Sequence, residues 1–317
     1  MPVDRIGQSL PALLANVRRR TDRRLKRCLQ SLAAERPRAV LFVAGCQRSG
    51  TNMVMDLLDA SRETDVYHEH DPRAFVRYEL RETEVIAALH ARSRAPVMVV
   101  KTLCDLERLP ALCARFRAAR VLWIYRDYRD VVNSMLVSFR NQAQQIRRLA
   151  SGEDTSWWGR GLSTATLAVL REHVTPDIDD ASAAALQWFV RAGMYFELEH
   201  HRAPTAMLVK YEALVNDPVH GAARIYDFAG VLRRGGFADG IHRQSVGKRR
   251  PPLLAPHVAA LCESLTRALD EACAGQRPAT ALVPAPSPAM TAFSSAPRDE
   301  LRAAHPYELP IHAPLDP

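Results

Sequence analysis

Apolar residues gather in four short runs along the middle of the chain, and these runs alternate with stretches of helical spacing. The runs are AVLFVAG, APVMVVK, RVLWIYR and TAMLVKYE, at residues 39–45, 95–101, 120–126 and 205–212. Short continuous runs of this kind are typical of strands buried on both faces of a parallel sheet. The helical stretches lie at 52–60, 73–92, 105–118, 129–149 and 181–201. The alternation predicts an α/β protein with three layers, in which helices flank a central parallel sheet.

The two ends of the chain differ from its middle. Residues 1–36 predict a helical arm with a dense basic run, RRRTDRRLKR. Residues 274–317 hold nine of the 21 prolines and predict a tail without a core of its own. The functional domain is therefore expected at 37–273, where the irregular segment 150–180 is interpreted as an insert or lid. We favour a solvated helix face for the basic run over an arm that makes weak contact with a membrane surface.

Composition narrows the class of protein only in part. The chain has 317 residues, of which 47% are hydrophobic and 25% charged, as in an ordinary soluble globular protein. The net charge of +8 suits an anionic partner without choosing between nucleic acid, phosphate ester, acidic glycan and membrane. Six cysteines without C-x-x-C spacing indicate thiols in a reducing compartment. With no long apolar run and no secretory signal pattern at residues 1–20, we expect a cytoplasmic protein.

The stretch GCQRSGTN, at residues 45–52, carries the first candidate chemistry. A glycine-rich turn between a strand and a helix points several backbone N–H groups at one anion, at the positive end of the helix dipole. Ser49 and Thr51 add hydroxyl donors, and Arg48 adds a fork suited to phosphate or sulfate oxygens. A nucleoside triphosphatase needs lysine and then Ser or Thr after the second glycine, where this chain has Thr51 and Asn52. The loop is therefore predicted to bind a phosphorylated ligand without magnesium.

A second candidate site follows the run at 120–126. The stretch IYRDYRDVVNSMLVSF ends a predicted strand at Arg126 and opens a helix for which Asp127 is a plausible N-cap. Ser134 lies eight residues after Arg126, in the second turn of that helix. An arginine and a serine at this separation can hold one phosphate from two sides.

With these two stretches, the sequence resembles the sulfotransferases that use 3′-phosphoadenosine 5′-phosphosulfate (PAPS). QRSGTN matches the family's 5′-phosphosulfate loop except at Asn52, and RDYRDVVNS matches its 3′-phosphate motif R-x-x-x-D-x-x-x-S. The stretches 209–231 and 245–265 resemble two later family segments, so the resemblance spans residues 39–270. It implies a P-loop-like fold and an enzyme that transfers a sulfuryl group in line to a hydroxyl or amine.

The resemblance implies a set of cofactor-binding residues for PAPS and its product, adenosine 3′,5′-bisphosphate. In this sequence they are Arg48, Ser49, Gly50, Thr51, Asn52, Arg126, Ser134, Tyr211, Ser245, Gly247 and Lys248. The implied place of Tyr211 is near the adenine.

Three residues are candidates for the chemistry itself. Arg48 and Lys101 are the cations expected to stabilise the leaving 5′-phosphate, so no metal is expected. The branch that acts on small phenols and steroids has a histidine base in K-T-H, but this chain reads KTLC. Glu69, in YHEHDPRAF, is therefore the predicted base, as in the tyrosylprotein and some bacterial carbohydrate enzymes, whose motif spacing is the most similar. His68 and His70 are the alternative bases, and a surface turn without function is the third interpretation.

The sequence leaves the acceptor open among small molecules, glycans, lipids and peptide tyrosine, and it leaves the oligomeric state open. The segments 70–95 and 140–185 are expected to shape the acceptor site. No aromatic residues interleave with the basic run at 242–250, so nucleic acid is not the expected partner. Two alternative functions remain: a P-loop nucleotide kinase or triphosphatase, and a nucleotide-binding protein without turnover, whose loop is weakened by Asn52.

Overall fold

The computed structural model describes residues 26, 30, 38–153, 156–233 and 235–276. The predicted arm at 1–36 therefore lies outside the described residues except at two positions, and the predicted tail at 274–317 does so from residue 277 onward. These two residues, Lys26 and Gln30, contact the segment 59–64, which leads into the second strand of the chain. Lys26 Nζ lies 3.0 Å from Asp59 Oδ1, and the Gln30 amide donates to the carbonyls of Arg62 and Thr64 at 2.8 and 3.0 Å.

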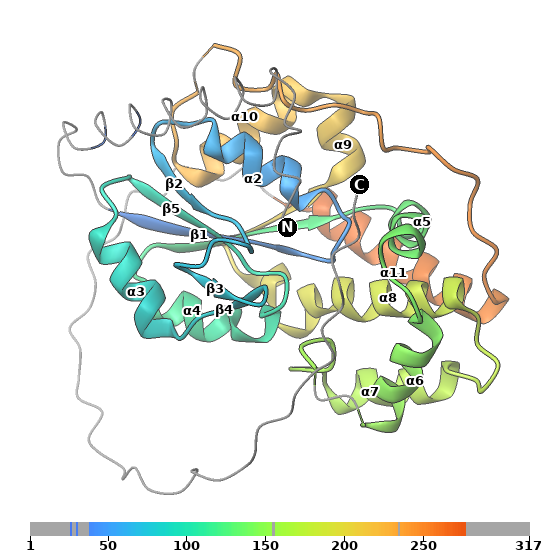
Figure 1. The fold of residues 1–317 in the computed structure, drawn as a ribbon. Coiled ribbons are helices and arrows are strands. Elements are labelled where there is room, and N and C mark those ends of the chain that lie inside the picture. Colours follow the sequence, from blue (N-terminus) through green and yellow to red (C-terminus); the bar gives the residue numbers. More distant parts are fainter. Residues whose placement is uncertain (1–25, 27–29, 31–37, 154–155, 234, 277–317) are drawn as a thin grey trace, which may run out of the picture. The chain divides into compact units, whose positions relative to one another are not determined.

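A five-stranded parallel sheet forms the centre of the domain (Figure 1). Its strands are β2 (Thr64–Tyr67), β5 (Val97–Lys101), β1 (Ala39–Gly45), β6 (Ala119–Tyr125) and β7 (Ala206–Lys210), in this spatial order. A separate two-stranded hairpin joins β3 (Phe75–Val76) to β4 (Glu79–Leu80). From β1 the chain continues to β2 on one side of the sheet, and from β6 it continues to β7 on the other side. The direction of winding therefore reverses between the neighbouring strands β1 and β6. In open α/β sheets such a reversal opens a crevice at the carboxyl ends of the strands, where ligands bind.

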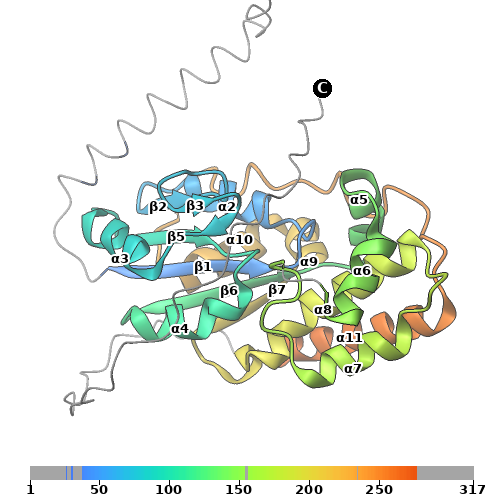
Figure 2. The same cartoon turned by 60° about the horizontal axis from the view of Figure 1, so that its bottom comes forward.

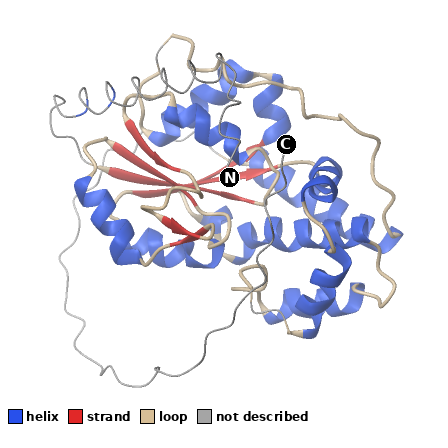
Figure 3. Cartoon of the chain, in the orientation of Figure 1, coloured by secondary structure: helices blue, strands red, loops and turns tan. Residues whose placement is uncertain are grey.

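Helices cover both faces of this sheet, as Figures 2 and 3 show. They are α2 (Thr51–Asp59), α3 (Thr83–Arg92), α4 (Leu109–Arg115), α5 (Tyr128–Ser138), α6 (Gln142–Ser151), α7 (Thr164–His173), α8 (Asp180–Glu197), α9 (Tyr211–Asn216), α10 (Pro218–Ala229) and α11 (Pro256–Ala274), with 3₁₀ turns η1 (Leu106–Arg108) and η2 (His200–Arg202).

Alternation along β1 explains the three layers. Leu41 and Val43 pack against α2, α9 and α10, whereas Val40 and Phe42 pack against α4, α8 and α11 on the opposite face. Successive side chains of a strand point to opposite faces, so an uninterrupted apolar strand needs a helical layer on each side. The predicted parallel sheet with helices on both faces is confirmed.

The prediction of a helix over 73–92 was wrong for its first ten residues. They form a turn and the β3–β4 hairpin, and the helix begins only at Thr83. Residues distant in the sequence hold the hairpin backbone: Asp105 Oδ2 accepts the Leu80 N–H at 2.8 Å, and Arg108 donates to the Leu80 carbonyl at 2.8 Å. Such tertiary bonds outweigh the weak local preference for a helix.

Two further predictions were wrong in the same region of the domain. The predicted helix over 129–149 is two helices, because Phe139 is extended and Asn141 adopts a left-handed backbone with φ of 60°. The segment 150–180, predicted to be irregular, contains α7, whose N-terminus is capped by Ser163 accepting from the Thr166 N–H at 3.1 Å. The short edge strand β2 was not predicted.

A buried histidine beneath the sheet gives the stability of the fold a defined pH dependence. His200 lies in η2, with its ring centroid 5.6 Å from that of Trp123 on β6, and its side chain is 6% exposed. Burial, together with a smaller effect of the neighbouring His201, lowers the pKa of His200 to about 4. The imidazole is therefore neutral in the folded protein at mildly acidic pH, where an exposed histidine is protonated.

We expect the free energy of unfolding to fall by about 2 kcal/mol between pH 7 and pH 5 through His200 alone. The pKa of His200 is about 6.5 in the unfolded chain, so the unfolded state takes up the proton first as the pH falls. Urea denaturation at both pH values measures the loss. His200→Gln should remove this part of it, whereas the exposed His220→Gln should not. An unchanged pH dependence in His200→Gln would contradict a neutral buried imidazole.

Candidate active site at the carboxyl ends of the strands

A cavity of about 410 Å³ opens where the winding of the sheet reverses. It collects residues from the loops that follow β1, β2, β5 and β6, and from α5, α9 and the segment before α11. The predicted site residues that line it are Arg48, Gly50, Thr51, Asn52, Glu69, Lys101, Arg126, Ser134, Tyr211 and Ser245. Ser49 does not line the cavity but is buried between two lining residues, whereas Gly247 and Lys248 are exposed outside the lining.

The loop after β1 is held in an unusual backbone conformation. Arg48 and Gly50 both have positive φ, at 67° and 91°. This turn carries Ser49 into the interior, where its side chain is fully buried and its hydroxyl has no protein partner. Helix α2 begins at Thr51, so its unpaired N–H groups and dipole point to the same side as the loop. A buried hydroxyl without a partner beside a helix N-terminus suits an anionic ligand.

The two sequence stretches meet at Arg48 and Ser134. Arg48 Nε donates to Ser134 Oγ at 2.8 Å, although 86 residues separate them. A guanidinium N–H of Arg126 donates to the backbone carbonyl of Arg48 at 3.4 Å. The loop after β1 and the β6–α5 connection therefore form one wall of the cavity.

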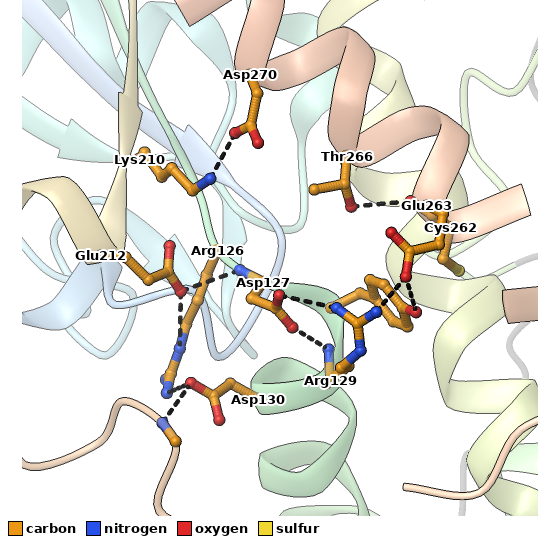
Figure 4. A network of polar contacts seen from close by, with 12 residues as sticks. Arg126, Asp127, Arg129, Asp130, Lys210, Glu212, Cys262, Glu263, Thr266 and Asp270 are labelled. Carbon is orange, nitrogen blue, oxygen red and sulfur yellow. Dashed lines mark hydrogen bonds and ion pairs between the residues drawn. The ribbon is translucent and has the colours of Figure 1, made fainter. Parts of the chain in front are cut away.

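Arg126 is the most connected side chain of this wall (Figure 4). Its guanidinium donates to Asp130 Oδ2 at 3.0 Å and to the backbone carbonyl of Ser245. It also lies over the ring of Tyr211, 4.6 Å from the centroid. Asp130 Oδ2 accepts from the Gly247 N–H at 3.1 Å, so this carboxylate ties the segment before α11 to α5. The Nε atom of Arg126 is buried without a hydrogen-bond partner.

Glu212 is a site residue that the sequence analysis missed, although it directly follows Tyr211. Its Oε1 atom accepts from the Asp127 N–H at 3.1 Å and lies 3.9 Å from Arg126 Nε. Burial raises the pKa of Glu212, against the opposing effect of its hydrogen bonds and of Arg126. Figure 4 shows Arg129, the other arginine of this turn, directed away from Arg126 toward Glu263 on α11.

A second cluster, on the far side of the loop, is centred on Lys101 at the end of β5. The Lys101 ammonium is 2% exposed, and its Nζ atom lies 2.6 Å from Glu69 Oε2 and 2.6 Å from Asn52 Oδ1. An ammonium group has three N–H donors, so these two contacts leave one donor for a ligand. Because Asn52 accepts through its oxygen, its NH₂ group remains a hydrogen-bond donor. The amide at position 52 thus has a structural role: it holds the buried lysine.

The two histidines beside Glu69 occupy a different position. The rings of His68 and His70 stack on each other with centroids 5.5 Å apart, and Glu69 alone of the three lines the cavity. Burial lowers the pKa of His68, chiefly by removing its ring from water. This arrangement favours Glu69 over either histidine as the group that faces a ligand.

Several lining residues were not predicted as site residues. Gln47 has both side-chain amide atoms buried without a protein partner. Leu103 and Phe139 provide an apolar wall, and His242 contributes from the segment before α11. The sequence signal for Gln47 was its place inside the loop. The signal for Leu103 was its place at the histidine position of the K-T-H motif. No local signal marks Phe139 or His242, because they reach the cavity only through the fold.

The cysteine at the base of the loop is a poor nucleophile. Burial raises the pKa of the Cys46 thiol to about 12, so this thiol is uncharged at neutral pH. Cys104, which follows Lys101 by three residues, has its pKa raised to about 12 by the same cause. The five cysteines within the described part of the chain are free thiols.

A family model for the sulfotransferase family matches residues 67–233, which is just over half of the chain. The chain therefore belongs to the sulfotransferase family, as its motifs indicated, and it is a sulfotransferase by class. The matched segment includes Glu69, Lys101, Arg126, Ser134 and Tyr211. The loop after β1 precedes the match, and Arg48 connects it to Ser134 within the match.

Several solved structures are similar to this chain at low identity. The sulfotransferase domain of the Synechococcus PCC 7002 olefin synthase is 13% identical, with 74% of this chain and 96% of that chain covered and a TM-score of 0.44. A sulfotransferase from Alicyclobacillus acidocaldarius is 16% identical (76% and 94% covered, TM-score 0.41). A mouse sulfotransferase in complex with PAP is 15% identical (76% and 91% covered, TM-score 0.38). A comparison with curated proteins gave no match.

Within the described part of the chain, no helix combines the length and apolarity that crossing a membrane requires.

We expect Gly50→Ala to destabilise the protein more than Gly152→Ala. Both glycines have a left-handed backbone, with φ of 91° and 83°, so each substitution costs about 1–2 kcal/mol for that reason. Only at Gly50 would the new Cβ meet another group, Tyr211 Cδ2 at 2.2 Å, whereas nothing lies within 4 Å at Gly152. Displacing this packed ring adds about 1–3 kcal/mol. Urea denaturation of both variants measures the difference, and equal losses would show that Tyr211 gives way freely.

Proposed function

We propose that this sulfotransferase uses PAPS as its donor and transfers the sulfuryl group in line to a hydroxyl or amine acceptor. The observation that supports this proposal is the contact of Arg48 with both Ser134 and Arg126. Two sequence motifs 78 residues apart, each with the residues expected to bind one end of the donor, are joined by the Arg48–Ser134 and Arg126–Arg48 hydrogen bonds. A ligand with two separated phosphate groups suits such a wall.

The polar atoms left without protein partners fit this ligand. Ser49 Oγ, Arg126 Nε and the Gln47 amide are buried donors that a phosphate or sulfate can satisfy. In the proposed complex Arg126 and Ser134 hold the 3′-phosphate, and Ser49, Gly50 and Thr51 hold the 5′-phosphosulfate through the loop. Tyr211 packs beside the adenine. Ser245 and Gly247 fix the segment that carries Lys248, which closes over the phosphates.

The donor supplies an activated sulfuryl group when it is bound, and the residues of the chain supply charge and position. Arg48 and Lys101 neutralise the charge that develops on the leaving phosphate, as preorganised cations do in phosphoryl transfer. Asn52 orients Lys101, whose third N–H is available for this task. The proposed reaction needs no metal, because arginine and lysine occupy the places where a nucleoside triphosphatase uses lysine and magnesium.

Glu69 is the proposed general base, which removes the proton from the acceptor. Its carboxylate pairs with Lys101 at 2.6 Å. A negatively charged donor gives Lys101 a second anionic partner, which leaves the carboxylate more available to the acceptor. This arrangement connects activation of the base to donor binding. His68 and His70 are the less favoured bases, since their rings pair with each other outside the lining.

We expect Arg126→Ala to weaken binding of adenosine 3′,5′-bisphosphate at least 30-fold. Removing one partner of a buried, charge-assisted interaction costs about 2 kcal/mol or more, which is about 30-fold in affinity. Isothermal titration calorimetry measures the change, and thermal melting with Arg126→Lys separates it from misfolding.

Arg129→Ala is the matched control, because Arg129 comes from the same turn but pairs with Asp127 and Glu263 outside the cavity lining. Its affinity for the bisphosphate should remain close to wild type. Tighter binding of magnesium-ATP than of the bisphosphate, with ATP turnover, would overturn the proposal in favour of a kinase or triphosphatase.

We expect Glu69→Gln to retain binding of adenosine 3′,5′-bisphosphate but to lower sulfuryl transfer by a factor of about 10²–10⁴, the usual contribution of a general base. Transfer is measured as bisphosphate release from PAPS with a panel of phenols, sugars, long-chain alcohols and tyrosine peptides.

Asn52→Leu is the matched variant, since it removes the other partner of Lys101 but keeps the carboxylate. A smaller loss in Asn52→Leu than in Glu69→Gln distinguishes proton removal from the holding of lysine. Wild-type transfer rates in Glu69→Gln would exclude Glu69 as the base and direct attention to His68→Gln. Binding without transfer for every acceptor, in wild type as well, would favour a nucleotide-binding protein without turnover.

A further inference from the structure

Two segments beside the cavity carry positive charge without any acidic residue. Residues 131–152 contain three arginines, and residues 240–262 contain four lysines and arginines, and neither segment contains Asp or Glu. In a chain with 43 basic and 35 acidic residues, this separation of charge is pronounced. The seven cations are Arg140, Arg147, Arg148, Arg243, Lys248, Arg249 and Arg250.

Exposed apolar side chains belong to the same two segments. Val137 on α5 is 62% exposed and Leu253, before α11, is 93% exposed, while Leu136 and Phe139 are also exposed. These four belong to the eight large apolar residues that are exposed in the described part of the chain. Isolated exposed apolar residues are ordinary, but a group of them within a basic region is typical of surfaces that meet membranes.

Hydrogen bonds join the two segments into one surface. Asn133, one helical turn before Val137, donates from Nδ2 to the carbonyl of Arg250 at 3.0 Å. The Gly247 N–H donates to Asp130 Oδ2, and the Ala255 N–H donates to Ser182 Oγ at 2.9 Å. The segment before α11 therefore runs past α5 with fixed contacts at both ends, as Figure 2 also shows. We call the exposed residues of 136–140 and 248–253 the rim surface.

The rim surface adjoins the opening of the cavity. Phe139 belongs to both, because it is exposed and also lines the cavity, and Ser245 lines the cavity three residues before the rim surface. Three acidic side chains on α5, α8 and α11 are already engaged within the protein, and one of them, Glu263, pairs with Arg129. Asp130 accepts from Arg126 and Gly247, and Asp180 accepts the Ala143 N–H at 2.8 Å.

We propose that the rim surface docks the enzyme on an anionic lipid membrane, with the opening of the cavity against the headgroups. Lysine and arginine side chains are attracted to the negative surface potential of an anionic leaflet. The exposed apolar side chains add burial in the headgroup region, which a soluble polyanion does not offer. This combination favours a membrane over an acidic glycan as the partner. Only the further consequence, that the acceptor hydroxyl comes from the lipid side, rests on the proposed function.

The test is sedimentation of the full chain with vesicles of phosphatidylcholine that contain 30% phosphatidylglycerol. The wild type should bind these vesicles, bind pure phosphatidylcholine far more weakly, and lose binding as salt increases. Val137→Glu combined with Leu253→Glu should weaken partitioning at least tenfold, and Arg140→Glu should act in the same direction. The basic run at residues 18–27 is identical in all variants, so it cannot cause a difference in vesicle binding between them.

Matched controls come from α10, on the other face of the sheet. Val219 is 63% exposed, and Val219→Glu combined with the exposed Arg224→Glu makes the same kinds of change away from the cavity. These controls should bind vesicles like the wild type. Thermal melting checks the folding of each variant, and Val137→Ser with Leu253→Ser provides a milder pair that should also weaken binding.

The proposal would be overturned if the wild type did not bind vesicles, or if the rim and α10 variants bound them equally. It would also be overturned if heparin, a soluble polyanion, displaced the vesicles and bound the protein independently of Val137 and Leu253. Affinity for adenosine 3′,5′-bisphosphate is measured in parallel. A wild-type protein that does not bind the bisphosphate would refute the proposed donor without affecting the docking result. The failure of the proposed function and the failure of the docking proposal are therefore distinguishable.

Discussion

The guanidinium of Arg126 is the group through which the separate elements of the site become one structure. It is buried at the end of β6, where a charge without partners would be strongly unfavourable. It is stabilised by partners from four places in the chain: the Arg48 carbonyl, the Asp130 carboxylate, the Ser245 carbonyl and the face of the Tyr211 ring. The wall of the cavity is thus set by the requirement to satisfy one buried cation.

Lys101 imposes a second constraint of the same kind from the other side of the loop. A lysine that is almost fully buried needs acceptors, and it has a carboxylate from Glu69 and an amide oxygen from Asn52. The amide explains why a residue without a hydroxyl stands at position 52. A Ser or Thr there would have a shorter side chain with a hydroxyl in place of the amide. The loop therefore provides an acceptor for the Lys101 ammonium group at position 52.

The proposed function and the proposed docking surface have one feature in common, which is the segment before α11. It contributes Ser245 to the cavity, is held to α5 through Asn133 and Asp130, and then exposes Leu253. Most residues of 242–253 are exposed, and hydrogen bonds to Asp130 and Asn133 tie this part of the segment to α5. The same hydrogen bonds therefore support both the proposed membrane-docking surface and the proposed donor site.

The sequence alone determined the layers of the fold and predicted the principal candidate site residues, because both follow from short-range patterns. The uninterrupted apolar run of β1 requires helices on both faces, and the residues of GCQRSGTN and RDYRDVVNS are contiguous in the chain. Tertiary structure decided the rest. Asp105 and Arg108 turned a predicted helix at residues 73–82 into a turn and a hairpin, since bonds from a distant loop outweighed local preference. Contact of Asn52 with Lys101, and of Glu212 with Arg126, joins residues 49 and 86 positions apart, and no local pattern records such distances.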